Sequence, residues 1–191
     1  MRAAVCLSRC RPCLSGVLIL SVLLLTSPTA DPAPSPDLLA TLLVQPFPEP
    51  LPAPALSLRG MDGRPLRLDH LKGQVVFINF WATWCVPCRQ EIPVMERLYQ
   101  DYRERGFAVV AVDFKETTAE IQRFVRELSL SFPIGEDPEG AAAHAFGVRG
   151  LPVTYLLGRD GRILWKAIGS REWDTPASRA YFEEILQGPQ P

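Results

Sequence analysis

Two cysteines three positions apart follow a short apolar run, and this arrangement constrains the chain more than any other feature. The run at 75–78 is rich in β-branched and aromatic residues, which is typical of a buried strand. The residues after Cys88 contain few helix breakers, so Cys85 and Cys88 are predicted at a strand-to-helix junction. Free backbone N–H groups and the helix dipole favour negative charge there, including that of a thiolate. The pair therefore predicts a dithiol that is oxidised and reduced in place.

Two other interpretations of this spacing are a zinc site and a purely structural disulfide. A zinc site needs a second pair of ligands, but His70 and His144 are isolated in the sequence, so no metal site is expected. A purely structural disulfide is the other alternative, and a bridge closing so small a loop constrains the unfolded chain little. Redox chemistry is the interpretation that the strand-to-helix context favours.

The residues around the cysteines resemble a known family. Residues 80–88 read Phe-Trp-Ala-Thr-Trp-Cys-Val-Pro-Cys and resemble the active-site signature of the thioredoxin superfamily. The longer segment 75–93 looks like the TlpA/ResA/DsbE-like branch of membrane-tethered thioredoxin-like proteins. The resemblance extends over about residues 54–186 and includes Gly-Leu-Pro-Val-Thr at 150–154. It implies an α/β fold, namely a thioredoxin-like three-layer sandwich with a central mixed sheet and an added N-terminal β-hairpin.

Patterns along the rest of the chain predict the elements of such a fold. Short alternating segments flank the Asp62-Gly63 turn and predict the added hairpin. The other predicted elements are strands at 74–80, 107–112, 150–157 and 162–168, an edge segment at 131–135, helices at 88–105, 138–146 and after Thr117 or Thr118, and a last helix capped by Asp174 or Thr175.

Three segments are predicted along the chain. Residues 1–30 combine a positive head, an apolar stretch and small residues, which is the layout of an export signal. The apolar stretch is shorter than the about 20 residues of a membrane span, so a cleaved signal and a retained N-terminal membrane anchor both stay open. Residues 31–54 are rich in proline and predict an extended spacer, with one or two helical turns at 37–44. Residues 55–188 are the predicted thioredoxin-like domain.

The net charge limits the classes of partner that are expected, and the cysteine content limits the expected compartment. The formal net charge of −1 gives no electrostatic support to a nucleic-acid partner. The cysteines number five, and three of them lie inside the predicted export signal: Cys6, Cys10 and Cys13. Removal of the signal would leave only the pair after the strand, as expected for a working dithiol in an oxidising compartment. We expect the periplasm or the outer face of the cytoplasmic membrane.

The position of the cysteines and the resemblance assign the reacting groups. Cys85 comes first, at the predicted helix start, and is expected to be the nucleophile. Cys88 lies one turn further on and is expected to be the more buried resolving thiol, so that the two form a Cys85–Cys88 disulfide. The resemblance also implies that Pro152 has a cis peptide bond and faces this disulfide.

Further residues are expected to bind the substrate. Trp84 is predicted to pack beside the disulfide, and Val86 and Pro87 belong to the same predicted contact surface. The backbone of Leu151 or Val153 is expected to pair with an extended segment of the partner, as in strand addition.

Glu91 is the expected proton acceptor. Thioredoxin carries a buried aspartate where this chain has Asn79, which cannot ionise. ResA-like proteins instead place an acid after the second cysteine, and Glu91 matches it three residues after Cys88. The alternative is an ordinary solvated helix glutamate.

The resemblance implies an exported thiol–disulfide oxidoreductase that needs no cofactor. Its expected partners are envelope proteins with disulfides, such as apocytochrome c, and a membrane thiol electron donor. One alternative is a copper chaperone on the same fold, which would space its cysteines further apart and add a histidine. The other is a peroxiredoxin-like peroxidase, whose threonine and proline set is not supplied here. The redox potential and the net direction of the reaction stay open.

Overall fold

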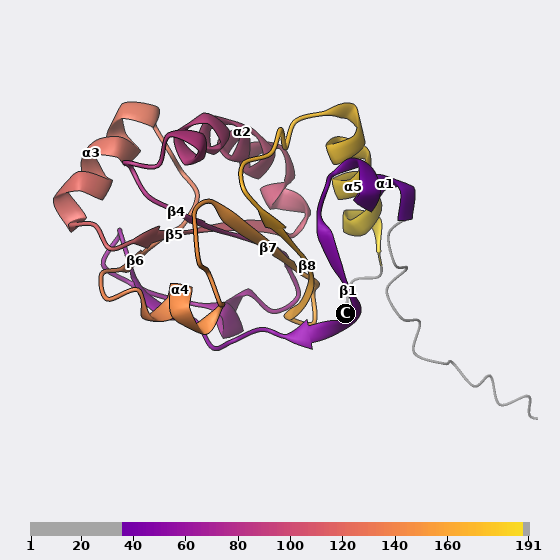
Figure 1. Cartoon of the computed structure of the whole chain (residues 1–191), viewed down its shortest axis with the longest axis horizontal. Coiled ribbons are helices and arrows are strands. Elements are labelled where there is room, and N and C mark those ends of the chain that lie inside the picture. The colour runs from indigo at the N-terminus through magenta and orange to yellow at the C-terminus, as the bar shows by residue number, and fades with distance from the viewer. Residues whose placement is uncertain (1–35, 189–191) are drawn as a thin grey trace, which may run out of the picture. The chain divides into compact units, whose positions relative to one another are not determined.

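The structure, a computed structural model, describes residues 36–188 and shows one mixed sheet between helices (Figure 1). The predicted export segment at 1–30 and the start of the predicted spacer lie outside the described residues. The sheet has eight strands in the order β1-β8-β7-β4-β5-β6-β2-β3. The strands are β1 (Gln45–Pro52), β2 (Ser57–Gly60), β3 (Pro65–Arg67), β4 (Val75–Trp81), β5 (Phe107–Phe114), β6 (Ile134–Asp137), β7 (Val153–Leu157) and β8 (Arg162–Ile168).

The helices cover both faces of this sheet, as the sequence predicted. They are α1 (Pro36–Thr41), α2 (Val86–Tyr102), α3 (Thr118–Leu128), α4 (Ala141–Ala145) and α5 (Pro176–Gln187), and short 3-10 turns lie at Leu68–Leu71 and Arg103–Arg105. In Figure 1, α2, α3 and α5 lie on one side of the sheet and α4 lies on the other. The expected α/β sandwich with a central mixed sheet is confirmed, including the hairpin of β2 and β3, which joins the sheet through β6.

Strand β4 lies in the middle of the sheet and leads to the cysteines. It runs parallel to β5 and antiparallel to β7, and all of its residues are buried. A strand that is covered on both faces reads as a continuous apolar run rather than an alternating one. This explains why its sequence shows no polar alternation apart from Asn79.

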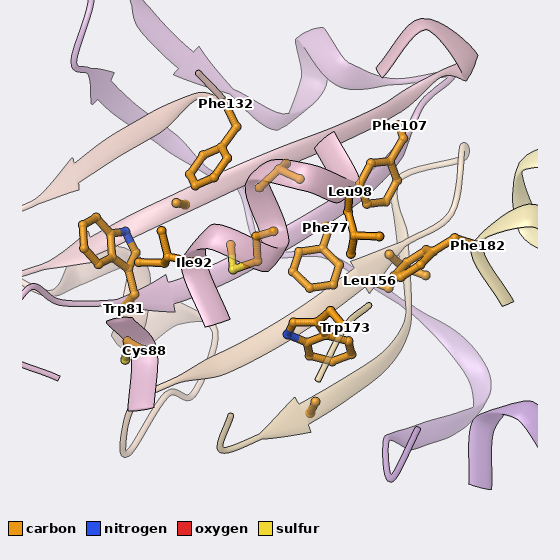
Figure 2. Packing of buried hydrophobic residues seen from close by; sticks show 14 of the residues in the cluster. Phe77, Trp81, Cys88, Ile92, Leu98, Phe107, Phe132, Leu156, Trp173 and Phe182 are labelled. Atoms are coloured by element: carbon orange, nitrogen blue, oxygen red, sulfur yellow. The ribbon is translucent and has the colours of Figure 1, made fainter. Parts of the chain in front are cut away.

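Alternate residues of β4 point to opposite faces of the sheet and pack into two separate hydrophobic cores. Phe77 and Trp81 face α2, α3 and α5, where they pack with residues such as Ile92 and Phe182. Phe80 belongs to the opposite core, beneath α4. Figure 2 shows the first core running from Cys88 and Trp81 at one end to Phe107 and Phe182 at the other. Both cysteines belong to this core cluster, and Cys88 is fully buried in it.

Local signals place the starts of α3 and α5 where the sequence predicted them, whereas α2 begins at Val86 rather than Cys88 and α4 spans only Ala141–Ala145. Thr117 forms a capping box with Glu120 at the start of α3, and Thr175 caps α5. Gly106 follows the α2 region with φ of 83°, a left-handed conformation that favours glycine. These ends are fixed by residues three or four positions apart, which is why a single sequence reveals them.

The N-terminal segment differs from the spacer expected over residues 31–54. The helical turns expected at 37–44 occur in part as α1, which packs against α5. Strand β1 follows and pairs antiparallel with β8, and Leu42 and Val44 are buried in the core. Prolines lack a backbone donor and are tolerated on an edge strand, which is where β1 lies. The sheet therefore begins before the expected domain boundary at residue 55.

Across residues 36–188, none of the helices is long and apolar enough to cross a membrane.

Candidate active site

Cys85 and Cys88 are joined by a disulfide at the junction of β4 and α2. The S–S distance is 2.01 Å and the Cα–Cα distance is 5.3 Å. Cys85 is the N-cap residue of α2, and its Sγ accepts the backbone N–H of Cys88 at 3.4 Å. Cys85 is 5% exposed whereas Cys88 is fully buried. The first sulfur is therefore the one that lies closer to solvent and to the helix N-terminus, where negative charge is favoured.

Two large apolar side chains next to Cys85 are exposed. Trp84 is 63% exposed and Val86 is 65% exposed, and Pro87 is exposed as well. Trp84 thus projects largely into solvent. Apolar groups that protrude around a reactive sulfur are suited to contact a partner protein.

The peptide bond between Leu151 and Pro152 is cis, as expected from the resemblance. Pro152 is buried, and its carbonyl oxygen accepts the N–H of Gly169 at 2.8 Å. Val153 pairs with Phe80 of β4 on one side and with Ile168 of β8 on the other. Leu151 precedes the strand and is half-buried. Of the two residues expected to present backbone to a partner, only Leu151 lies outside the sheet.

Glu91 belongs to α2 and is buried against the sheet, so it is not a solvated helix residue. It is 1% exposed. Its Oε1 accepts the Asn79 amide at 2.8 Å, and its Oε2 accepts the backbone N–H of Arg171 and the indole N–H of Trp173, each at 3.1 Å. Burial raises the pKa of Glu91, while these hydrogen bonds act in the opposite direction. Asn79 also donates to the Thr154 hydroxyl at 3.0 Å, which links Glu91 to β7.

A polar surface pocket adjoins Glu91. Glu91 is one of the residues that line this pocket, although its side chain is almost fully buried. The pocket is lined by Gln90, Glu91, Val94, Arg97, Ser170, Arg171, Glu172 and Asp174. The partners Arg171 and Trp173 were not found from the sequence, because they follow Glu91 by about eighty positions and no local pattern marks them.

A second buried acid, Asp113, was also missed. It lies at the end of β5, opposite Trp81 of β4, and is fully buried. Burial, and then the neighbouring Glu116 carboxylate, raise the pKa of Asp113 to about 9. A signal was present, because Asp113 directly follows an apolar strand and the carboxyl ends of parallel strands meet at one edge of a sheet.

No metal centre accompanies the disulfide in the part of the chain that the structure describes. There, no group of three or more histidine, cysteine or acidic side chains is placed to hold an ion. The histidines, His70 and His144, are both exposed.

Comparison with known proteins agrees with this geometry. Residues 51–166 match the AhpC/TSA family. The thiol-disulfide oxidoreductase ResA of Bacillus thuringiensis subsp. konkukian is 36% identical over 135 residues, which cover 71% of this chain and 75% of the relative. ResA of Halalkalibacterium halodurans is 42% identical over 107 residues, which cover 56% of this chain and 61% of the relative.

Solved structures give the same result for the fold. A crystal structure from Chlorobium tepidum, assigned as the thiol:disulfide interchange protein DsbE, superposes with a TM-score of 0.67 at 33% identity. The match covers 73% of this chain and 99% of that one. A second thiol:disulfide interchange protein of the same organism has a TM-score of 0.62 at 29% identity, with 74% and 97% coverage. The chain therefore belongs to the AhpC/TSA family, in the thioredoxin-like branch of thiol–disulfide oxidoreductases that includes ResA and DsbE.

Proposed function

We propose that this oxidoreductase is exported and reduces disulfides of envelope proteins, with Cys85 as nucleophile and Cys88 as resolving thiol. The observation that carries the assignment is the difference between the two sulfurs. Cys85 caps α2 beside exposed Trp84 and Val86, whereas Cys88 is fully buried. A partner disulfide reaches the first sulfur more readily than the second.

The first step forms a mixed disulfide. The Cys85 thiolate of the reduced pair attacks one sulfur of the partner disulfide, and the other partner sulfur leaves as a thiolate that takes up a proton. The N-terminus of α2 favours the thiolate before the attack. The partner is then joined to Cys85 by one disulfide bond and carries one free thiol.

The second step releases the reduced partner. Cys88 loses its proton, attacks the Cys85 sulfur, and displaces the second partner thiolate, which is protonated in turn. The partner thus gains two electrons and two protons, and the Cys85–Cys88 disulfide is formed. We assign proton acceptance from Cys88 to Glu91, because it is a buried acid on the same helix, three residues further on, and adjoins a polar pocket.

The partner is held by apolar side chains and by backbone. Trp84, Val86 and Pro87 form the exposed contact surface around Cys85. The backbone of Leu151, which precedes β7, adds hydrogen bonds to an extended partner segment. Pro152 lies between Leu151 and the sheet and shields the sulfurs from competing groups.

The export-signal pattern of the N-terminal segment supports an extracytoplasmic location. Residues 1–30 act as an export signal or an N-terminal membrane anchor, and the oxidoreductase domain, whose sheet already includes β1 (Gln45–Pro52), continues to residue 188. The named relatives are thiol–disulfide oxidoreductases. Apocytochrome c is the proposed substrate, since its haem-attachment Cys-x-x-Cys-His must be reduced, and a membrane thiol donor regenerates the dithiol.

The test traps the partner. Cys88→Ser should retain the attack by Cys85 but stop resolution, so mixed disulfides accumulate on a non-reducing gel of the envelope fraction. Cys85→Ser is the matched control and should trap nothing. In vitro, the reduced wild-type protein should reduce an oxidised peptide that carries Cys-x-x-Cys-His.

The control peptide keeps the disulfide and replaces the histidine and its neighbours. Equal rates with both peptides would argue against apocytochrome c while leaving the reductase intact. Full activity of Cys85→Ser would overturn the assignment of the nucleophile.

A further inference from the structure

The loop that leads from β4 to Cys85 is held by an acidic side chain from the neighbouring strand end. Glu116 lies just after β5 and is half-buried. One of its carboxylate oxygens accepts the backbone N–H of Thr83 at 2.5 Å, and the other accepts the Thr83 hydroxyl. On the opposite side, Arg89 of α2 donates to the Thr83 carbonyl at 3.2 Å. All polar groups of Thr83 are therefore engaged.

Thr83 is continuous with the turn that presents the nucleophile. The N–H of Cys85 donates to the carbonyl of Ala82 at 3.1 Å, so residues 82–85 form one hydrogen-bonded turn. Any displacement of Thr83 consequently displaces Cys85. Since a small misplacement of a reacting atom costs much of the rate, the contact between Glu116 and Thr83 bears directly on the chemistry.

Behind Glu116 lies the fully buried carboxyl group of Asp113. Its Oδ1 accepts the backbone N–H of Glu116 at 3.2 Å. Its Oδ2 is buried and has no hydrogen-bond partner among residues 36–188. A buried, charged carboxylate without a partner is costly, so this position favours the protonated form of the acid.

We propose that Asp113 and Glu116 form a carboxyl pair that retains one proton and positions the Cys85 loop through Thr83. In this arrangement Asp113 is neutral and Glu116 carries the charge that accepts both Thr83 hydrogen bonds. Hydrogen bonds to an ionised acceptor are roughly twice as strong as neutral ones. Asp113 and Glu116 are positioning residues, because they act on Cys85 through Thr83.

The charges around the pair support one shared proton. Asp113 faces Glu116 in the following loop and, further away, Glu120 of α3, and both acids raise its pKa after the larger effect of burial. The cation on this side, Arg89 of α2, is directed at the Thr83 carbonyl and stacks on the Phe124 ring at 4.9 Å. Lys115 lies over the ring of Phe114. Loss of the shared proton therefore places two carboxylates side by side, and their repulsion releases Thr83.

This inference rests on the proposed role of Cys85 as nucleophile and predicts a specific pH profile. The rate at which the reduced wild-type protein attacks hydroxyethyl disulfide should rise with the Cys85 thiolate and then fall above a pH of about 9, where Asp113 ionises. Asp113→Asn keeps the shape of the side chain and cannot ionise, so its profile should lack the alkaline fall.

Two further variants separate positioning from ionisation. Glu116→Gln should lower the rate constant at all pH values, by roughly tenfold or more, because a neutral amide replaces the charged acceptor. Thr83→Val removes only the hydroxyl bond and leaves the acid pair, so the rate should fall while the alkaline limb persists. Glu127→Gln, an exposed acid on α3, is the matched control and should behave as wild type.

The outcomes distinguish the shared proton of Asp113 and Glu116 from their positioning role. Superimposable pH profiles of wild type and Asp113→Asn would overturn the shared proton. Rates of Glu116→Gln and Thr83→Val equal to that of Glu127→Gln would overturn the positioning role. Circular dichroism of each variant shows whether it is folded. If Asp113→Asn does not fold, the wild-type profile is the test, because a profile without an alkaline fall would overturn the shared proton. A wild-type protein that fails to attack the disulfide at every pH would instead contradict the proposed function.

Discussion

Asn79 donates a hydrogen bond of 2.8 Å to the carboxylate of Glu91, and it does so from the strand position at which thioredoxin carries an aspartate. In this chain the buried acid, Glu91, lies on α2 instead of β4, and Asn79 at the strand position orients its carboxylate. Asn79 also binds Thr154 of β7, so the amide fixes Glu91 relative to the segment that follows Pro152. This arrangement places one buried carboxyl group on the helix that carries both cysteines.

Glu91→Gln is expected to shift the titration of the cysteine pair to lower pH and to slow the resolution of the mixed disulfide. A nearby carboxylate disfavours a second negative charge, so its removal favours the thiolate. The amide cannot accept the proton that Cys88 loses. The measurement is the rate of thiol alkylation against pH, together with the decay of a preformed mixed disulfide. Glu139→Gln, an exposed acid, is the control, and curves identical to wild type would remove Glu91 from the mechanism.

Asp113→Asn is expected to flatten the dependence of folding stability on pH. The folded-state pKa of Asp113 is raised from 3.8 to about 9. Its neutral form therefore contributes stability that is fully present below the unfolded pKa and is lost as pH rises through the folded value. Wild type should lose stability between these two pH values, and the variant should lose less. Urea unfolding midpoints across this range measure the slope, and parallel slopes would contradict the raised pKa.

Trp84→Ala is expected to raise KM for a protein disulfide while leaving the reduction of hydroxyethyl disulfide nearly unchanged. The side chain is 63% exposed and contributes contact area rather than core packing. A small disulfide covers much less of that surface than a protein does. Leu128→Ala removes another exposed apolar side chain, from the end of α3, and is the matched control. An equal loss with both substrates would assign Trp84 to the reacting geometry instead.

Leu42→Ala is expected to destabilise the protein by about 2 kcal/mol or more, as for other buried leucines that leave a cavity. The neighbouring Leu43→Ala should have little effect, because Leu42 is 6% exposed and Leu43 is 69% exposed. The comparison tests whether the N-terminal segment belongs to the folded domain. Chemical unfolding of both variants gives the answer, and two neutral substitutions would restore the spacer interpretation.

Much of the fold was predictable from local patterns. The apolar run of β4, the cysteine spacing, the Asp62-Gly63 turn and the cap at Thr117 each depend on residues a few positions apart. Backbone dihedral preferences and hydrogen bonds between near neighbours determine these features, so one sequence contains enough information to find them. The cysteine pair and its strand-to-helix setting were found for the same reason.

The sequence by itself therefore determined the dithiol, its place in a thioredoxin-like sheet, and Glu91 as the acid to examine. Only the tertiary structure decided that β1 pairs with β8, that Arg171 and Trp173 hold Glu91, and that Asp113 is buried beside Glu116. Edge pairing, burial and pKa depend on groups that are distant in the chain and adjacent in space. A carboxyl group's proton affinity is set by the solvent it loses and the charges it meets, and both arise only when the chain has folded.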